Sequence, residues 1–255
     1  MIHIDVTGQG PALVLLHGWG LHGGVFAPLI PALSVHHTVY NVDLPGHGRS
    51  AHVPVPSQLQ DWAQAVLDEV PAAHWLGWSL GGLVAQQAAL MAPQSVRSLA
   101  VIASVPCFVR QPDWPHGMAP SVLQGFIAHF QAHYADTVDR FLALDLMTLP
   151  GGQHAAAQLR DTLLDVGRPS DDAITTGGAL LQTCDLRQPL SQLQVPSLWV
   201  AGERDRLASP AALQATAHQT PGAVHVTLAR TGHAPFLGDT DAVVQALHAF
   251  HNAMP

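Results

Sequence analysis

The sequence predicts an α/β protein in which helices cover both faces of a mostly parallel central sheet, with an all-helical block inserted as a cap. Three observations lead to this prediction. Short apolar runs alternate along the chain with segments whose apolar residues recur at helical spacing. Most of the runs are continuously apolar, which is typical of parallel strands buried on both faces. Between about 107 and 190 only helical patterns occur.

The first half of the predicted sheet comes from the N-terminal apolar runs. Strands are expected at 3–6, 12–17 and 37–44. The third strand ends at the segment PGHGRS, because glycine and proline favour turns. The segment 59–70, LQDWAQAVLDEV, follows the breakers Pro54 and Pro56 and predicts a helix, since its apolar residues have helical spacing.

The second half of the sheet follows the same alternation. The expected elements are a strand at 73–78, a helix at 80–93, a strand at 96–104, strands at 196–205 and 223–229, and a closing helix at 239–253. Pro93 ends the first of these helices, because proline lacks the N–H that a helix interior requires.

The block at 107–189 is predicted to form a helical cap. Two helical patterns occupy it, at 121–147 and 155–166, and it contains no strand candidate. An all-helical insertion in an alternating chain is best explained as a cap over one end of the sheet. The core domain then comprises 1–106 and 190–255. The alternative is that these helices are additional crossover connections.

Composition and charge restrict the function classes. The chain has 255 residues, is 48% hydrophobic and 11% charged, and has a formal net charge of −8. This composition supports a buried core and lacks the basic surface that nucleic-acid binding needs. No signal peptide and no membrane-spanning run is recognised. We therefore expect a cytoplasmic protein with no nucleic-acid or membrane partner, and we expect a monomer.

The cysteines and histidines do not form a metal-binding pattern. Cys107 and Cys184 are far apart, so reduced thiols are expected, with a disulfide across the insertion as the alternative. The 17 histidines are scattered and place no ligand pair on one helix face. No metal and no cofactor are therefore expected.

The motif Gly77-Trp78-Ser79-Leu80-Gly81 lies where an expected strand ends and an expected helix begins. A G-x-S-x-G pattern in this context predicts a nucleophile elbow. The two glycines are needed because a Cβ at either position would collide with the tight turn. Ser79 is expected to have a positive φ, with its hydroxyl at the N-terminus of the helix. The alternative is a glycine-rich turn that only packs a helix tightly on a strand.

A serine nucleophile needs a base and a carboxylate that orients the base. GERD places Asp205 after a late strand and GHAPF places His233 after the last strand, giving the order serine, acid, histidine. Glu203 in the same turn is the alternative acid. The simpler alternatives are that Asp205 only caps the next helix and that His233 is a surface histidine.

Two backbone N–H groups are expected to stabilise the oxyanion of an acyl-transfer reaction. The N–H of Leu80 is one of the unpaired donors at the start of the helix after Ser79. The N–H of Trp19 is the second candidate, because it lies in HGWG directly after the second strand.

The segments HGWG, DLPGHGRS, GWSLGG, GERD and GHAPF occur together in the order found in the α/β-hydrolase family, which the chain resembles over essentially its whole length. Within that family it is most similar to the esterases of biotin synthesis that cleave the methyl ester of pimeloyl-[acyl-carrier protein]. The segments LVLLHGWGLH, WLGWSLGGLVA, RFLAL and DLRQPL carry this similarity.

The resemblance implies an α/β-hydrolase fold with a helical cap, and a serine carboxylesterase that releases pimeloyl-[acyl-carrier protein] and methanol without a cofactor. It implies Ser79 as nucleophile, His233 as base and Asp205 as acid. Substrate contacts are implied for Trp19, Ser79, Leu80, Phe141, Leu142, Ala143, Leu144, Asp145 and His233. Asp145 stands where the family pattern has an amide or a neutral residue.

The resemblance also implies that an acidic acyl carrier protein docks transiently on arginines of the cap. In this chain these are Arg140 and Arg160, with Arg168 also in the cap. The cap carries several aspartates as well, and a chain of net charge −8 repels an acidic partner at long range.

Two other functions are consistent with the sequence. A broad-specificity esterase for short acyl esters would use the same machinery, and comparing carrier-bound with simple esters separates the two. A non-catalytic ligand-binding receptor on a hydrolase scaffold belongs to another class. The complete set of serine, histidine and acid argues against the receptor.

Overall fold

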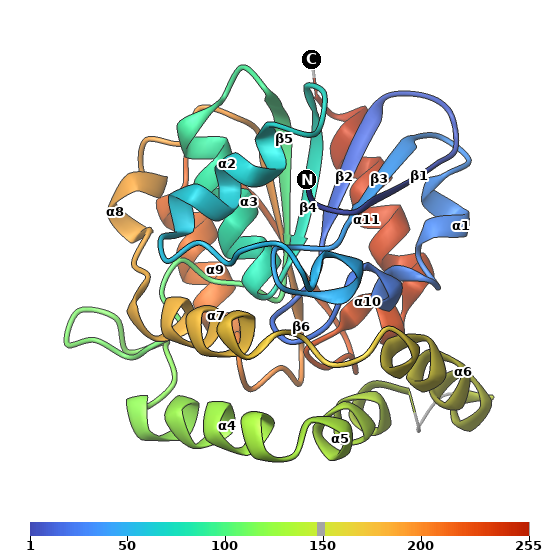
Figure 1. The fold of residues 1–255 in the computed structure, drawn as a ribbon. Helices are drawn as coiled ribbons and strands as arrows, with labels where there is room; N and C mark the ends of the chain where they lie inside the picture. The colour runs from blue at the N-terminus through green and yellow to red at the C-terminus, as the bar shows by residue number, and fades with distance from the viewer. Residues whose placement is uncertain (147–150, 255) are drawn as a thin grey trace.

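The computed structural model describes residues 1–146 and 151–254 (Figure 1). Residues 147–150, which belong to the predicted cap, and Pro255 lie outside the described residues. The last residue of the helical pattern expected at 121–147 therefore also lies outside them.

A seven-stranded sheet runs through the centre of the molecule, in the order β1-β3-β2-β4-β5-β6-β7. The strands are β1 Ile4–Thr7, β2 Ala12–Leu16, β3 Thr38–Val42, β4 Ala73–Trp78, β5 Val96–Ile102, β6 Ser197–Gly202 and β7 Val224–Leu228. All neighbours pair in parallel except β1, which is antiparallel to β3. The predicted mostly parallel sheet is confirmed, with each expected strand present.

Helices cover both faces of the sheet. The core helices are α1 Ile30–Leu33, α2 Leu59–Leu67, α3 Leu80–Met91, α8 Arg187–Leu190, α9 Pro210–Gln219, α10 Pro235–Gly238 and α11 Thr240–Asn252, with short 3-10 turns at Gly23–Phe26 and Gly48–Ser50. The helices α2, α3, α8 and α9 pack on one face, while α1, α10 and α11 pack on the other (Figure 1).

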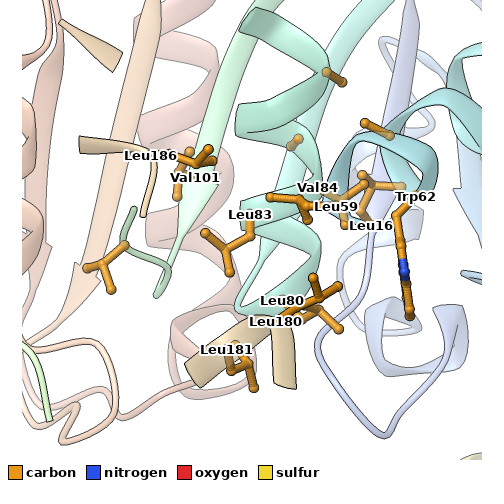
Figure 2. Packing of buried hydrophobic residues seen from close by; sticks show 14 of the residues in the cluster. Leu16, Leu59, Trp62, Leu80, Leu83, Val84, Val101, Leu180, Leu181 and Leu186 are labelled. Carbon is orange, nitrogen blue, oxygen red and sulfur yellow. The ribbon is translucent and has the colours of Figure 1, made fainter. Parts of the chain in front are cut away.

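Successive residues of the central strands face opposite sides of the sheet and so build two cores. In β2, Val14 and Leu16 belong to the core under α2 and α3, whereas Leu13 and Leu15 belong to the core under α11. Figure 2 shows the first core, where Leu83 and Val84 of α3 lie among apolar side chains of neighbouring elements. Burial on both faces explains why these strands read as continuous apolar runs.

Four longer helices lie between β5 and β6: α4 Pro120–Ala132, α5 Tyr134–Leu146, α6 Gly152–Asp165 and α7 Asp171–Thr183. Figure 1 places α4, α5 and α6 along the lower edge of the view, beyond one end of the sheet. In the described part of 107–189 no strand forms, and only isolated bridges such as Val109 with Met118 occur. The division into core and cap stays a prediction, and α8 Arg187–Leu190 crosses its expected boundary at 189/190.

Two details of the cap differ from the sequence prediction. The single helical pattern at 121–147 is split, because His133 leaves the helical region at φ −135° and ψ 54°. Helix α7 was not expected, since Gly177 and Gly178 lower its intrinsic helix propensity. These glycines let the helix lie close to its neighbours: a Cβ at Gly177 would come within 2.5 Å of the Trp19 ring.

Both cysteines are free thiols, so the alternative disulfide between Cys107 and Cys184 is not formed. Among the described residues, no helix has the length and apolar character needed to cross a membrane. Residues 1–146 and 151–254 also contain no group of three or more His, Cys, Asp or Glu side chains suited to a metal ion.

Candidate active site

Ser79 lies in a strained turn between β4 and α3. Its φ is 54° and its ψ is −120°, which confirms the expected positive φ. A Cβ at Gly77 would lie 2.3 Å from the carbonyl oxygen of Gly81, and a Cβ at Gly81 would lie 2.3 Å from that of Leu16. The glycines are therefore required by close backbone contacts, as the motif predicted. Ser79 is 8% exposed, so its hydroxyl is nearly enclosed.

The structure brings Ser79, His233 and Asp205 together from three distant parts of the chain. The Nε2 of His233 lies 3.0 Å from the Oγ of Ser79, and its Nδ1 lies 2.8 Å from Oδ2 of Asp205. The three residues follow β4, β7 and β6, which are near neighbours in the sheet. The carboxyl ends of parallel strands meet at one edge of the sheet, and this convergence forms the site.

Electrostatics favour a positively charged state of His233. Burial of the imidazole opposes protonation, but the charge and hydrogen bond of Asp205 and the charge of Asp145 outweigh it, so the pKa of His233 is raised. A base whose protonated form is stabilised in this way can accept the proton of an attacking serine. The neutral form is needed for that step, so the rate is expected to fall as pH falls through this raised pKa.

The two candidate acids have different roles. Glu203 is exposed, and its Oε2 accepts a hydrogen bond from the backbone N–H of Arg230 at 2.7 Å, so it organises the turn after β7. Asp205 is 5% exposed and contacts His233. Its second oxygen accepts the N–H groups of Leu207 and Ala208 at 2.8 and 3.1 Å. Asp205 therefore fixes its own turn while it orients the imidazole.

Of the two residues predicted to supply oxyanion donors, Leu80 follows Ser79 directly in the chain and Trp19 lines the same cavity as Ser79. Within the described residues, the backbone N–H groups of Trp19 and Leu80 have no hydrogen-bond partner. The side chain of Leu80 is fully buried in the core, so only its backbone is available to the site. The Trp19 indole donates a hydrogen bond to the carbonyl oxygen of Ile174 at 3.0 Å, and its ring centroid lies 4.5 Å from that of Phe130. These contacts join the Trp19 loop to cap helices α4 and α7.

Two buried histidines, His17 and His47, support this loop, and the sequence analysis assigned no role to either. Their ring centroids are 5.1 Å apart. The Nε2 of His47 accepts the backbone N–H of Gly20 at 3.2 Å, which leaves its Nδ1–H to donate to the carbonyl of Pro45 at 3.0 Å. The loop that carries Trp19 is thus tied to the turn after β3.

His17 repeats the same arrangement one step earlier in the loop. Its Nε2 accepts the N–H of Leu44 at 2.9 Å and its Nδ1–H donates to the carbonyl of Gly18 at 2.8 Å. Burial is the main cause that lowers the pKa of His17 and that of His47, in each case to about 3. Both imidazoles therefore remain neutral at physiological pH. The sequence signal that could have identified them was their position, since His17 lies within HGWG and His47 within DLPGHGRS.

A cavity of about 760 Å³ opens over Ser79 between the core and the cap. Its walls are mostly apolar and aromatic. The apolar lining residues include Trp78, Phe108, Met118, Leu123, Phe126, Phe130, Val138 and Leu181. Such a wall suits the hydrocarbon chain of an acyl group, while polar and charged side chains complete the lining.

The predicted substrate contacts divide into two groups. The residues that line the cavity are Trp19, Ser79, Phe141, Leu144, Asp145 and His233. Leu80, Leu142 and Ala143 are not among the lining residues: Leu80 and Leu142 are buried in the core and Ala143 is exposed. Consecutive residues of a helix point in different directions, so one segment of α5 cannot turn all its side chains into the cavity.

Arginines gather at the same cavity. Four of the ten basic residues of the chain line it, namely Arg140, Arg204, Arg206 and Arg230. All four are exposed, and within the described residues none forms a salt bridge with a carboxylate. Arg160, which sequence reasoning also selected, is paired with Asp139 at 2.5 Å, and Arg168 is paired with Asp171.

The chain is similar to known proteins over almost its whole length. Residues 13–246 match the sequence profile of the Alpha/beta hydrolase family. A pimeloyl-[acyl-carrier protein] methyl ester esterase of Stenotrophomonas maltophilia strain K279a is 48% identical, with 99% of this chain and 97% of the relative aligned. The protein of the same name from Xanthomonas campestris pv. campestris strain B100 is 49% identical, with both chains fully covered.

Solved structures are similar over almost the whole chain. An esterase from Exiguobacterium antarcticum superposes with a TM-score of 0.86 at 19% identity, covering 99% of this chain and 96% of the other. An enol-lactonase from Burkholderia xenovorans LB400 superposes with a TM-score of 0.81 at 21% identity, covering 98% and 96%. At these identities the two structures bear on the fold alone.

The roles of Asp205 and Glu203 can be distinguished by matched amide substitutions. Asp205→Asn should lower kcat by about 10⁴-fold, since the amide no longer holds the imidazole in the correct tautomer. Glu203→Gln should leave kcat nearly unchanged, because Glu203 contacts only the turn. Steady-state hydrolysis of p-nitrophenyl acetate measures both, and equal losses in the two variants would contradict the assignment.

The role of His47 can be tested by removing its acceptor. His47→Ala should lower kcat about tenfold to a hundredfold, because the loop that carries the Trp19 N–H loses its support. His47→Gln, whose carbonyl can accept the Gly20 N–H, should recover part of the loss. Rates are expressed per active site titrated with a fluorophosphonate, and exposed His52→Ala serves as the control. Wild-type kcat in His47→Ala would refute this role.

Proposed function

Because this chain belongs to the alpha/beta hydrolase family, we propose that it hydrolyses a carboxylic ester with Ser79 as nucleophile, His233 as base and Asp205 as the orienting acid. The physiological ester under this proposal is the methyl ester of pimeloyl-[acyl-carrier protein], as the names of its relatives suggest. The observation that carries the proposal is the continuous chain of contacts from Ser79 to Asp205, at 3.0 and 2.8 Å, inside an apolar cavity.

The reaction follows from the positions of these groups. The Oγ of Ser79 attacks the ester carbonyl while Nε2 of His233 takes its proton. The N–H groups of Trp19 and Leu80 stabilise the oxyanion. The imidazolium then protonates the departing methoxide, which leaves as methanol, and an acyl-enzyme remains. Water activated by His233 attacks the acyl carbonyl and releases the free carboxylate.

The cavity supports an acyl substrate that enters with its ester end first. The aromatic wall formed by Trp78, Phe126 and Phe130 contacts hydrocarbon favourably. Leu144 is 81% exposed yet lines the cavity, so it lies where the cavity meets solvent. An acyl chain attached to a carrier can pass this opening while the carrier remains outside.

The arginines at the cavity are the proposed docking site for an acidic carrier protein. Arg140 belongs to α5 of the cap, whereas Arg204, Arg206 and Arg230 come from loops of the core. Unpaired arginines beside the cavity concentrate positive charge locally, although the chain as a whole carries −8. Arg160 is a weaker candidate for docking, because Asp139 already neutralises its charge.

A carrier-bound biosynthetic substrate also favours the cytoplasm as the compartment, and we propose a monomer that uses no cofactor.

The substrate can be tested by comparing two esters. We expect kcat/KM for pimeloyl-[acyl-carrier protein] methyl ester to exceed that for methyl butyrate by at least about a hundredfold, since only the first uses the carrier contacts. Ser79→Ala should remove both activities. A higher kcat/KM for the simple ester would favour the broad-specificity esterase. Full activity in Ser79→Ala would refute the proposed nucleophile.

Carrier docking can be tested by charge reversal. Arg140→Glu and Arg206→Glu should each lower kcat/KM for the carrier-bound ester by about tenfold and lower p-nitrophenyl acetate hydrolysis much less, when both rates are measured on the plateau of the pH profile. Arg97→Glu makes the same change on an exposed residue at the start of β5, away from the cavity. If Arg97→Glu has the same effect as the other two variants, overall charge and not docking explains the loss.

A further inference from the structure

Asp145 is a buried carboxylate beside the site that the mechanism above does not use. It lies near the end of cap helix α5, is 6% exposed and lines the cavity together with His233. Its Oδ1 accepts a hydrogen bond from the backbone N–H of Ala234 at 3.4 Å. A Cβ at Gly232 would come within 2.5 Å of the same oxygen. The carboxylate therefore packs against both neighbours of His233.

A buried carboxylate is costly unless a charge or hydrogen bonds compensate it. Burial raises the pKa of Asp145, and the nearby carboxylate of Asp205 adds to this, while the charge of His233 and the N–H groups of Ala234 and Gly232 oppose it. The compensation thus comes from His233 and the two residues that flank it. A side chain that only packed on an apolar helix face would not need a carboxylate.

The loop 232–234 is held at three points by three different elements. The indole N–H of Trp78, at the end of β4, donates to the carbonyl of His233 at 2.7 Å. Asp205, after β6, contacts the Nδ1 of the imidazole. Asp145 contacts the N–H of Ala234 from α5. The first two contacts come from the core domain, whereas the third comes from the cap.

We propose that Asp145 is a positioning residue that couples the cap to the reaction. Its carboxylate holds the loop 232–234 from the cap side, and its negative charge stabilises the imidazolium form of His233 while the acyl group is transferred. This inference rests on the proposed function only in that His233 is the base of an ester hydrolysis. It does not depend on which ester is the physiological substrate.

The other ionisable groups around His233 must be considered to decide whether removal of the Asp145 charge raises or lowers the pKa of His233. The cavity is also lined by His129 and Arg140 of the cap and by Arg204, Arg206 and Arg230 of the core loops. The positive charges of the arginines favour the neutral imidazole. The acids in the lining are Asp145 and Asp205, and both favour the imidazolium. Removing the charge of Asp145 must therefore lower the pKa of His233.

The substitution Asp145→Asn removes the charge and keeps an oxygen that can accept the Ala234 N–H. The pKa of His233 is expected to fall, so the acid limb of the kcat/KM profile for p-nitrophenyl acetate should move to lower pH. The plateau kcat should fall by about tenfold, because the imidazolium loses part of its stabilisation. Asp136→Asn makes the same charge change at an exposed position in the first turn of α5 and should leave the profile unchanged.

The pKa of His233 can also be measured without turnover, by NMR titration of the histidine resonances. The signal of His233 is the one missing from a His233→Gln variant. A lower pKa in Asp145→Asn than in wild type supports the proposal, whether or not the chosen ester is a substrate. An unchanged pKa, or an acid limb that coincides with wild type, would overturn it even if kcat fell. Neither readout depends on the fraction of active protein, so a partly misfolded variant does not imitate the result.

An inactive wild-type protein would count against the proposed function and not against the coupling. In that case the NMR titration alone decides the role of Asp145. Conversely, an active wild-type esterase whose His233 titrates identically in Asp145→Asn keeps the proposed function and refutes the coupling.

Discussion

The hydrogen bond between Ser79 and His233 joins the turn after β4 to the loop after β7 at the candidate active site. Ser79 forms it from a positive φ, a conformation that costs on the order of 1–3 kcal/mol. The surrounding structure supplies this free energy. The close contacts of Gly77 and Gly81 with neighbouring backbone, and the buried packing of α3 on the sheet, leave the turn no relaxed alternative.

The second constraint is that loops from distant parts of the chain must be held in fixed positions relative to Ser79. Neutral buried histidines do this on one side. The Nε2 of each accepts a backbone N–H across the junction between the Trp19 loop and the turn after β3, and its Nδ1–H donates within its own segment. Asp205 and Trp78 hold the His233 loop on the other side. The cap touches both loops, through the Trp19 indole and through Asp145. Cap position and active-site geometry are therefore linked.

Much of the fold could be predicted from the sequence because strands buried on both faces produce continuous apolar runs. The elbow and the order of Ser79, Asp205 and His233 were also predictable, since tight turns demand glycine at fixed positions. Helix α7 was not, because its glycines are tolerated only through contact with Trp19 and the cap. The gathering of Arg204, Arg206 and Arg230 at one cavity depends on the order of the strands, which periodicity does not reveal.

The most direct test of Ser79 as the nucleophile is to trap the covalent intermediate. The protein is mixed with p-nitrophenyl acetate, quenched in acid within the first turnover, digested and examined by mass spectrometry. We expect one acetyl group, on the hydroxyl of Ser79, formed at the rate of the initial p-nitrophenol burst. Turnover with the acetyl group on another side chain, or with no adduct at any time during the burst, would contradict it.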